Sequence, residues 1–479
     1  MPQILINGHA VQAENGQTVL EAALAHGHEI PYFCYHPSLS IAGNCRVCVV
    51  QVEGRSWVEI ACNMPATEGL RVLTDSELVR EHRKAMLQLT LLNHPVDCGI
   101  CDKAGECTLQ DYHYKHNGAP SVSLDAKVRA TKLYPLSERI VLDNERCILC
   151  SRCVRFTHEV SKSHALGIQQ RGDTSLVRAA ANHAFDDDPY SDNVIDICPV
   201  GALSSRSFLY KSRVWYLKPT PSVCPGCARG CTVQLWHRKP EWKLNALDAQ
   251  GNVRIERVTP LENPQVNGPW ICNKGRDLAQ IFERPRALQA MHSGMPIDLH
   301  AAIEAARRLI ERATRRVAVV SSWGSNEELQ AFQRLLGSRF SAFVKNDRVP
   351  AVGETVQDEI LIRADKNPNT TTARTLFPVL PGDVAAPDSA DLVLIWGEGF
   401  DFARVPAKAQ VIYLNAYSQP ENARADVFIP ISIQTERSGH YTNFEGVTSH
   451  FEPCFAKPQS IAHAESLFAE LAALVEVPA

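Results

Sequence analysis

Fifteen of the sixteen cysteines, together with one histidine, form four groups of four residues within the first 272 positions. Thiolates are soft, anionic ligands that suit iron–sulfur centres and zinc. A structural zinc ion needs one compact tetrahedral site, whereas four consecutive sites are typical of a series of redox centres. The pattern therefore predicts a protein that relays electrons. The groups are Cys34/Cys45/Cys48/Cys62, His94/Cys98/Cys101/Cys107, Cys147/Cys150/Cys153/Cys198 and Cys224/Cys227/Cys231/Cys272.

The first and third groups have spacings known from ferredoxins. The first, C-x10-C-x2-C-x13-C, predicts a [2Fe–2S] cluster, and Gly43 before Cys45 would allow the backbone to approach it closely. The third is the C-x2-C-x2-C run of bacterial ferredoxins, completed by Cys198 before Pro199, and it predicts one [4Fe–4S] cluster. A zinc site is the alternative for both groups.

The second group, H-x3-C-x2-C-x5-C, depends on the role of His94. The alternative for this residue is an ordinary capping or core histidine. Without it the group has only three thiolates, so we expect His94 to be the fourth ligand of a [4Fe–4S] cluster. A neutral imidazole in place of an anionic thiolate should raise the reduction potential, as histidine does in Rieske centres.

The fourth group, C-x2-C-x3-C-x40-C, predicts a further [4Fe–4S] cluster, with a zinc ribbon as the alternative. Cys454 stands alone, and we expect it to be a buried structural cysteine.

The elements around these groups can be predicted in part. Two strands and a helix within residues 3–27 lead into Cys34, and Thr18 with Glu21 forms a capping-box pattern at the start of that helix. Residues 76–93 have helical periodicity and end next to His94. Proline-rich stretches at 218–221 and 283–285 predict domain boundaries.

After residue 285 the composition changes. Predicted helices at 299–313 and 325–337 alternate with apolar strands at 317–320, 392–396 and 411–414, which indicates an α/β domain with a parallel sheet. Gly397-Glu398-Gly399 lacks the third glycine and the acidic residue of a dinucleotide site, so we expect a turn at the end of a strand. The sequence contains no P-loop, G-x-S-x-G or H-E-x-x-H motif.

Composition excludes several classes of protein. The formal net charge of −4 gives no electrostatic footprint for nucleic acid, and the sequence has no run of about 18 apolar residues that would predict a transmembrane helix. The first residues lack the features of a signal peptide, and the C-x2-C pairs favour reduced thiols. We therefore expect a cytoplasmic protein, or one held at the cytoplasmic face of the inner membrane by its partners.

Taken together, these motifs resemble those of the large iron–sulfur subunit of respiratory complex I, known as the G subunit in bacterial NADH:quinone oxidoreductases. The most specific segment is residues 94–107, HPVDCGICDKAGEC, and residues 146–156 and 198–203 match the next site of that family. The fourth group is similar to an off-path cluster of some bacterial members and to the proximal cluster of molybdopterin oxidoreductases. The resemblance is strong over residues 1–275. It weakens beyond, where residues 436–446 look like a segment of molybdopterin-binding enzymes.

The resemblance implies an α+β and α/β multidomain fold. The expected domains are a β-grasp [2Fe–2S] ferredoxin (1–78), a one-histidine, three-cysteine [4Fe–4S] domain (79–118), a [4Fe–4S] ferredoxin-like domain (119–216), a molybdopterin-oxidoreductase-type [4Fe–4S] domain (217–284) and a truncated molybdopterin-oxidoreductase-like α/β domain (285–479).

The resemblance also implies an electron-transfer subunit of an NADH dehydrogenase with no complete active site of its own. FMN and NADH are expected on a partner subunit with a small [2Fe–2S] companion, and the acceptor on a quinone module, hydrogenase or other reductase. The alternative is a catalytic molybdenum or tungsten subunit, as in an NAD-linked formate dehydrogenase. Lys274 supports it, because such enzymes place a lysine between cluster and pterin. The absence of cysteine from positions 273–453 argues against it, and we expect no molybdopterin.

Overall fold

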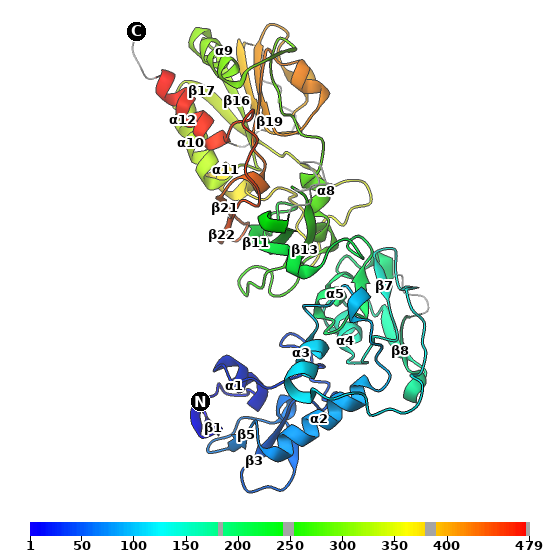
Figure 1. The fold of residues 1–479 in the computed structure, drawn as a ribbon. Coiled ribbons are helices and arrows are strands. Elements are labelled where there is room, and N and C mark those ends of the chain that lie inside the picture. Colours follow the sequence, from blue (N-terminus) through cyan, green and yellow to red (C-terminus); the bar gives the residue numbers. More distant parts are fainter. Residues whose placement is uncertain (181–184, 243–252, 379–388, 476–479) are drawn as a thin grey trace. The chain divides into compact units, whose positions relative to one another are not determined.

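The computed structural model describes residues 1–180, 185–242, 253–378 and 389–475. The chain divides into two compact units, Met1–Leu217 and Lys218–Ala479, and each is described by itself (Figure 1). Within the described residues, no helix combines the length and the apolar character that a membrane span requires.

The first unit begins with a five-stranded sheet in the order β2-β1-β5-β3-β4, covered by one helix. The predicted capping box is confirmed, because the Thr18 hydroxyl accepts from the Glu21 amide at 3.3 Å and the Glu21 carboxylate accepts from the Thr18 amide at 2.7 Å. Cys48 and Cys62 belong to the apolar core beneath this sheet. The elements are β1 (Gln3–Ile6), β2 (His9–Gln12), α1 (Val19–Ala25), β3 (Val49–Val52), β4 (Val58–Ile60) and β5 (Arg71–Leu73).

The predicted helix before His94 is confirmed as α2 (Glu77–Leu91), which begins where the Ser76 hydroxyl accepts from the Val79 amide. The rest of the unit consists of short elements joined by long irregular segments. These are α3 (Thr108–Tyr112), a π-helical turn (His113–Asn117), β6 (Tyr134–Pro135), β7 (Ile140–Leu142), α4 (Arg152–Glu159), β8 (Leu166–Gln169), β9 (Leu176–Ala179), α5 (Asn193–Ile197) and β10 (Leu203–Ser205).

The second unit opens with a three-stranded sheet and two short helices. The proline-rich stretch at 218–221, predicted to be a boundary, begins where the second unit begins, and it forms part of strand β11. Proline is tolerated there because β11 is an edge strand, where a missing backbone N–H costs no ladder bond. The elements are β11 (Leu217–Val223), β12 (Thr232–Arg238), β13 (Ile255–Pro260), α7 (Asn273–Arg276) and α8 (Leu278–Phe282).

The α/β domain is confirmed, and its sheet is parallel over five strands, with β14 and β15 added antiparallel at one edge. Its seven strands run in the order β15-β14-β20-β19-β18-β16-β17, and the pairs from β20 to β17 are parallel. The elements are β14 (Ala290–His292), β15 (Met295–Ile297), α9 (Leu299–Arg312), β16 (Arg316–Ser321), α10 (Asn326–Leu336), β17 (Phe340–Lys345), α11 (Thr370–Leu376), β18 (Leu392–Trp396), β19 (Gln410–Asn415), β20 (Val427–Pro430), the hairpin β21 (Gly439–Thr442) and β22 (Thr448–Phe451), and α12 (Ala464–Val475).

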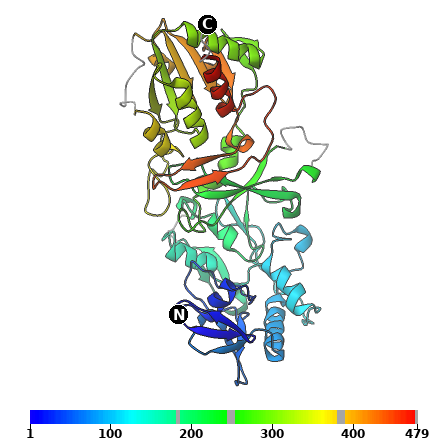
Figure 2. The ribbon, with the colours of Figure 1, turned by 90° about the vertical axis from the view of Figure 1, so that its left-hand side faces the viewer.

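Both faces of β18 are buried, which explains its uninterrupted apolar sequence. Val393 and Ile395 pack into the apolar cluster on one face. On the other face, Trp396 contacts the rings of Phe332 on α10 and Phe468 on α12, at centroid distances of 5.2 and 5.0 Å. Figure 2 shows the red ribbon of α12 beside the strands of this sheet. The sheet therefore has apolar packing on both of its faces.

Candidate iron–sulfur sites

The first group of cysteines lies on the loop after α1 and at the edge of the first core. Its thiols form two close pairs, because Cys34 is hydrogen-bonded to Cys45 and Cys48 to Cys62. The bond from Cys45 lowers the pKa of Cys34 to about 5. Gly43 has a left-handed φ of 61°, which favours glycine at this position. Two pairs of thiolates are the ligand arrangement that two irons of a [2Fe–2S] cluster require.

The second group lies between α2 and α3. The Nδ1 atom of His94 is buried and has no hydrogen-bond partner among the residues that the structure describes. Burial, followed by the charge of Arg146, lowers the pKa of His94 to about 4, so the imidazole is neutral, as a metal ligand must be. Arg146 also faces Cys101. Cys101 is the electrostatic neighbour of Cys98 and of Cys107. Arg146 therefore interacts electrostatically with both His94 and Cys101.

The third group combines a loop, the first turn of α4 and the residue that follows α5. Each of its cysteines is an electrostatic neighbour of the others. They line a small apolar cavity together with Leu142, Ile148, Ser151, Arg152, Val177, Val200, Ala202 and Leu203.

The fourth group lies on the β11–β12 connection and at the start of α7. The Cys224 amide donates to the Cys231 carbonyl at 2.8 Å, and Cys272 is the N-cap residue of α7. A β-carbon at Gly226 would lie 3.4 Å from the Cys224 sulfur, and one at Gly275 would lie 3.7 Å from it. The two glycines keep the space around the sulfurs open.

Burial raises the pKa of most of these thiols, to about 12 for Cys147, about 11 for Cys150 and Cys272, and well above the ordinary value for Cys153, Cys224 and Cys231. Neutral thiols gain nothing from such close grouping, and buried thiolates need a cation among them. In the described part of the chain, no three histidine, cysteine or acidic side chains converge on one point to hold a single ion. The thiolates of a cluster bind separate irons, so they need not converge in that way.

Direct contacts join the first and third groups. Arg152 donates to the Tyr35 carbonyl next to Cys34 and, at 3.0 Å, to the Ile197 carbonyl next to Cys198. Arg155 also donates to the carbonyl of Cys34 itself. The two loops are therefore held together by arginines of α4.

The second and third groups also meet. The amide of Thr108, next to Cys107, donates to the carbonyl of Pro199, next to Cys198, at 3.0 Å. Arg146, next to Cys147, reaches Asp97, next to Cys98, at 3.1 Å. The third group thus contacts both others. From the sequence we expected no role for Arg146 or Arg152, although each directly precedes a cysteine.

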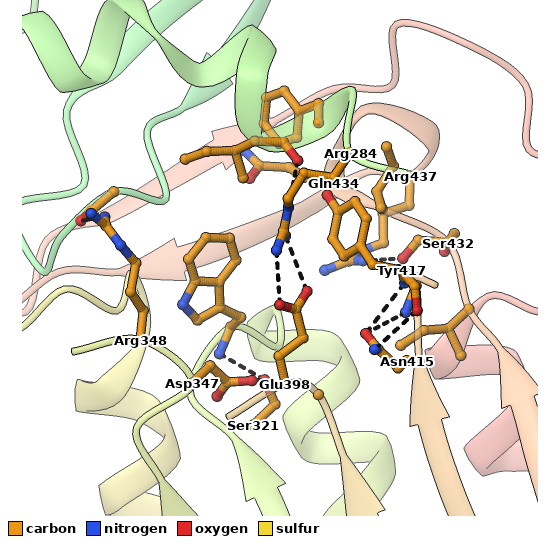
Figure 3. Close-up of a pocket in the computed structure, with 18 of the residues that line it drawn as sticks. Arg284, Ser321, Asp347, Arg348, Glu398, Asn415, Tyr417, Ser432, Gln434 and Arg437 are labelled. Carbon is orange, nitrogen blue, oxygen red and sulfur yellow. Dashed lines mark hydrogen bonds and ion pairs between the residues drawn. The ribbon is translucent and has the colours of Figure 1, made fainter. Parts of the chain in front are cut away.

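A separate cavity of about 430 Å³ lies in the second unit at the carboxyl ends of β16, β18 and β19 (Figure 3). Arg284 crosses it, donating to both oxygens of Glu398 at 2.8 and 3.0 Å and lying 3.7 Å from the centre of the Tyr417 ring. Lys274 and Gly226 line the same cavity.

The other guanidinium groups of the cavity also have carboxylate partners. Arg348 pairs with Glu354 at 2.8 Å and Arg437 with Glu328 at 2.9 Å. The positive charge of all three arginines is therefore balanced by the chain itself.

Two smaller predictions concern the same unit. Gly397 and Gly399 form the expected turn after β18, with φ values of 79° and 82°. A β-carbon at Gly397 would lie 2.2 Å from the Asp347 carboxylate. The prediction for Cys454 was wrong in part: its side chain is partly exposed, because it follows the edge hairpin β21–β22 rather than a core strand.

Family models match the chain in four places. They describe a 2Fe-2S iron–sulfur cluster binding domain (residues 2–77), the NADH-ubiquinone oxidoreductase-G iron–sulfur binding region (83–119), the ferredoxin-like domain of NADH-quinone oxidoreductase subunit 3 (137–204) and the molybdopterin oxidoreductase Fe4S4 domain (217–284).

Relatives include the G subunit of NADH-quinone oxidoreductase from Streptomyces coelicolor, 36% identical over 275 residues, which are 57% of this chain and 31% of the relative. The mitochondrial NADH dehydrogenase [ubiquinone] iron–sulfur protein 1 of Solanum tuberosum is 36% identical over 294 residues, 61% of this chain and 38% of the relative. A solved NAD⁺-reducing [NiFe]-hydrogenase in the H₂-reduced state is 32% identical and covers 44% of this chain and 91% of that chain, with a TM-score of 0.41.

The matched segment thus spans only about a third of the length of these curated relatives. Within residues 2–284 the chain has ferredoxin-like 2Fe-2S, 4Fe-4S and molybdopterin-oxidoreductase-type iron–sulfur domains in succession. Over that part it is a relative of the iron–sulfur G subunits of NADH-quinone oxidoreductases.

Proposed function

We propose that the chain is an electron-relay subunit of an NADH-oxidising complex and holds one [2Fe–2S] and three [4Fe–4S] clusters. When bound, each cluster can take up and release one electron. The proposed ligands are Cys34, Cys45, Cys48 and Cys62 for [2Fe–2S]; His94, Cys98, Cys101 and Cys107; Cys147, Cys150, Cys153 and Cys198; and Cys224, Cys227, Cys231 and Cys272. The proposed domains are 1–78, 79–118, 119–216, 217–284 and 285–479.

The observation that carries the proposal is the position of the third group between the first and the second. Arg152 bonds to carbonyls beside a cysteine of the first group and beside Cys198. The Thr108 amide, beside Cys107 of the second group, donates to the Pro199 carbonyl, beside Cys198 of the third. These contacts support a relay in the order first, third, second, rather than in the order of the sequence.

The partners follow from the same proposal. A flavin- and NADH-binding subunit with a small [2Fe–2S] companion would supply electrons, and a quinone module, hydrogenase or other reductase would accept them. The Gly397–Gly399 turn packs against the chain's own Asp347, which supports placing NADH on a partner. Contact with the cytoplasmic face of the inner membrane would come through partners.

A molybdenum or tungsten subunit is the second candidate function. It is favoured by Lys274 and Gly226, which line the cavity beside the fourth group. Against it, the three arginines of the cavity are paired with carboxylates, and positions 273–453 hold no cysteine. We therefore propose that residues 285–479 serve as a scaffold for partner subunits.

Metal analysis of the anaerobically purified chain tests the proposal. We expect about fourteen iron atoms and matching acid-labile sulfide, since one cluster has two irons and three have four each. About eight irons, or stoichiometric zinc, would contradict the four-cluster assignment. Stoichiometric molybdenum or tungsten would favour the second candidate. NADH oxidation by the isolated chain, measured with ferricyanide, would contradict the relay assignment.

A further inference from the structure

Gly201 lies where the second and third cysteine groups meet, and its lack of a side chain has a specific cause. A β-carbon at this position would lie 2.1 Å from the Cys101 sulfur and 3.1 Å from the Lys103 β-carbon. Real β-carbons do not approach other atoms so closely. The φ of Gly201 is outside the left-handed region, so its backbone would accept any residue. Glycine is therefore required here for space rather than for backbone conformation.

The chain around Gly201 belongs to the third site. Cys198 is three positions earlier, and the intervening Pro199 carbonyl accepts from the Thr108 amide of the second site. The Cys101 sulfur thus lies against the backbone that carries a ligand of the neighbouring site. Arg146 lies at the same place, because its δ-carbon would be 3.8 Å from a β-carbon at Gly201.

Arg146 is buried, with 6% of its surface exposed, and belongs to both sites. Its backbone precedes Cys147, while its guanidinium group forms ion pairs with Asp97 at 3.1 Å and Asp143 at 3.2 Å. Lys132 holds the same two carboxylates from a more exposed position. Arg146 is therefore the cation of this network that is buried against the Cys101 sulfur.

We propose that Gly201 and Arg146 are positioning residues for electron transfer between the second and third clusters. Because Gly201 has no side chain, the Cys101 sulfur has room to lie against the backbone of the third site while it binds iron of the second cluster. Arg146 places a buried positive charge beside that sulfur, which favours the reduced, more negative form of the second cluster and so raises its potential. This inference rests on the ligands proposed above.

The first test replaces Gly201 by alanine and compares the variant with Gly99→Ala. Gly99 lies in the same loop as Cys101, also outside the left-handed region, and a β-carbon there would meet nothing within 4 Å. We expect Gly201→Ala to lose or distort the electron paramagnetic resonance signal of the second cluster and to retain that of the first. Gly99→Ala should keep every signal. A wild-type signal from the second cluster in Gly201→Ala would overturn the role of Gly201.

The second test measures the potential of the second cluster in Arg146→Gln by redox titration. We expect the potential to fall by about 59 mV, which corresponds to a tenfold shift of the one-electron equilibrium toward the oxidised cluster. Arg146→Lys, which keeps the charge, should recover most of the shift. Arg139→Gln breaks the partly buried pair with Asp192 elsewhere in the unit and serves as the control. An unchanged potential in Arg146→Gln with an intact signal would overturn the role of Arg146.

The two tests also separate this inference from the proposed function. If the wild-type chain shows no signal from the second cluster, the ligand assignment fails. If the wild type shows it and both variants leave its shape and potential unchanged, only the present inference fails. If the Gly201→Ala protein does not accumulate in cells, the potential of the second cluster in Arg146→Gln decides whether the inference stands.

Discussion

The two units differ in how far the chain alone can hold their backbones in place. Among the described residues, ten non-glycine positions have a left-handed backbone, and nine of them lie in the first unit. Each such position costs about 1–2 kcal/mol. Two of them, Leu149 and Ser151, flank Cys150, and Arg46 lies between two cysteines of the first group. Part of this strain therefore lies in the loops of the first and third cysteine groups.

The second unit has the opposite character. Its parallel sheet has apolar residues on both faces, and only Ser293 has a left-handed backbone among its described non-glycine residues. The first unit thus combines a packed sheet with strained cysteine loops outside it, whereas the sheet of the second unit is stable through its own packing.

The largest expected effect is therefore that of iron removal. Metal binding is coupled to folding where ligand loops lack their own core. After anaerobic chelation we expect amides of residues 94–107 and 147–153 to exchange hydrogen as fast as an unfolded chain, while those of β18 stay protected. Hydrogen-exchange mass spectrometry of both forms measures this. Equal protection of the two units in the iron-free chain would contradict the comparison.

A single ligand should have a smaller but still large effect. We expect His94→Ala to lose about four irons and one [4Fe–4S] signal. His94→Cys should restore a cluster with a lower potential, because a thiolate adds negative charge. Iron analysis and redox titration check both variants.

His36→Ala is the matched control for His94. Burial, followed by the charge of Arg152, lowers the pKa of His36 to about 4 as well, but its Nδ1 accepts from the Ser38 amide at 3.2 Å. We expect this variant to keep all four clusters. Iron loss of equal size in both variants would make His94 an ordinary structural histidine.

The features that could be predicted are those that depend on residues close together in the sequence. The cysteine groups, the Thr18 capping box and the alternation around β16 and β18 are local patterns, and the last two are confirmed. The predicted boundary at residues 218–221 agrees with the division of the chain after Leu217. The strand over the same prolines could not be predicted, because only the position of β11 at a sheet edge makes proline compatible with it.

The contacts between sites could not be predicted from the sequence. Gly201 and Arg152 matter because loops more than 90 residues apart in the chain approach each other, as in the bonds of Arg152 to the Tyr35 carbonyl and of Thr108 to the Pro199 carbonyl. A glycine after Cys-Pro or an arginine before a cysteine has many local explanations. Only the fold shows which sulfur and which carbonyl each one faces.

A moderate effect is expected in the second unit from Arg284→Ala, which removes the cation paired with Glu398, leaving it the Gln419 amide, and removes a cation from the Tyr417 ring. About a third of the Arg284 side chain is exposed, so we expect a loss of about 1–2 kcal/mol in the free energy of unfolding. Urea unfolding of the second unit measures it, and the iron content should not change.

Arg307→Ala on α9 is the control for Arg284. It removes exposed pairs with Glu304 and Glu311, which contribute little. A loss of iron from the Arg284 variant would show that the cavity and the cysteine sites depend on each other, against the comparison above.

The smallest expected effect is a pH dependence at Asp391, at the start of β18. Its carboxylate accepts from the Thr314 hydroxyl at 2.6 Å and from the amides of Thr314 and Arg315 at 2.9 Å, and these bonds lower its pKa. A lowered pKa in the folded state means that the stabilisation is present above the ordinary aspartate pKa and is lost as the pH falls through the folded value. We expect Asp391→Asn to cost about 1 kcal/mol at pH 7 and nothing at a pH below both values, because the bonds to the charged carboxylate are then absent in both proteins. Thermal unfolding of the second unit between pH 7 and pH 3 measures the difference. A gap between the two proteins that does not narrow in acid would show that the carboxylate acts there through its shape rather than its charge.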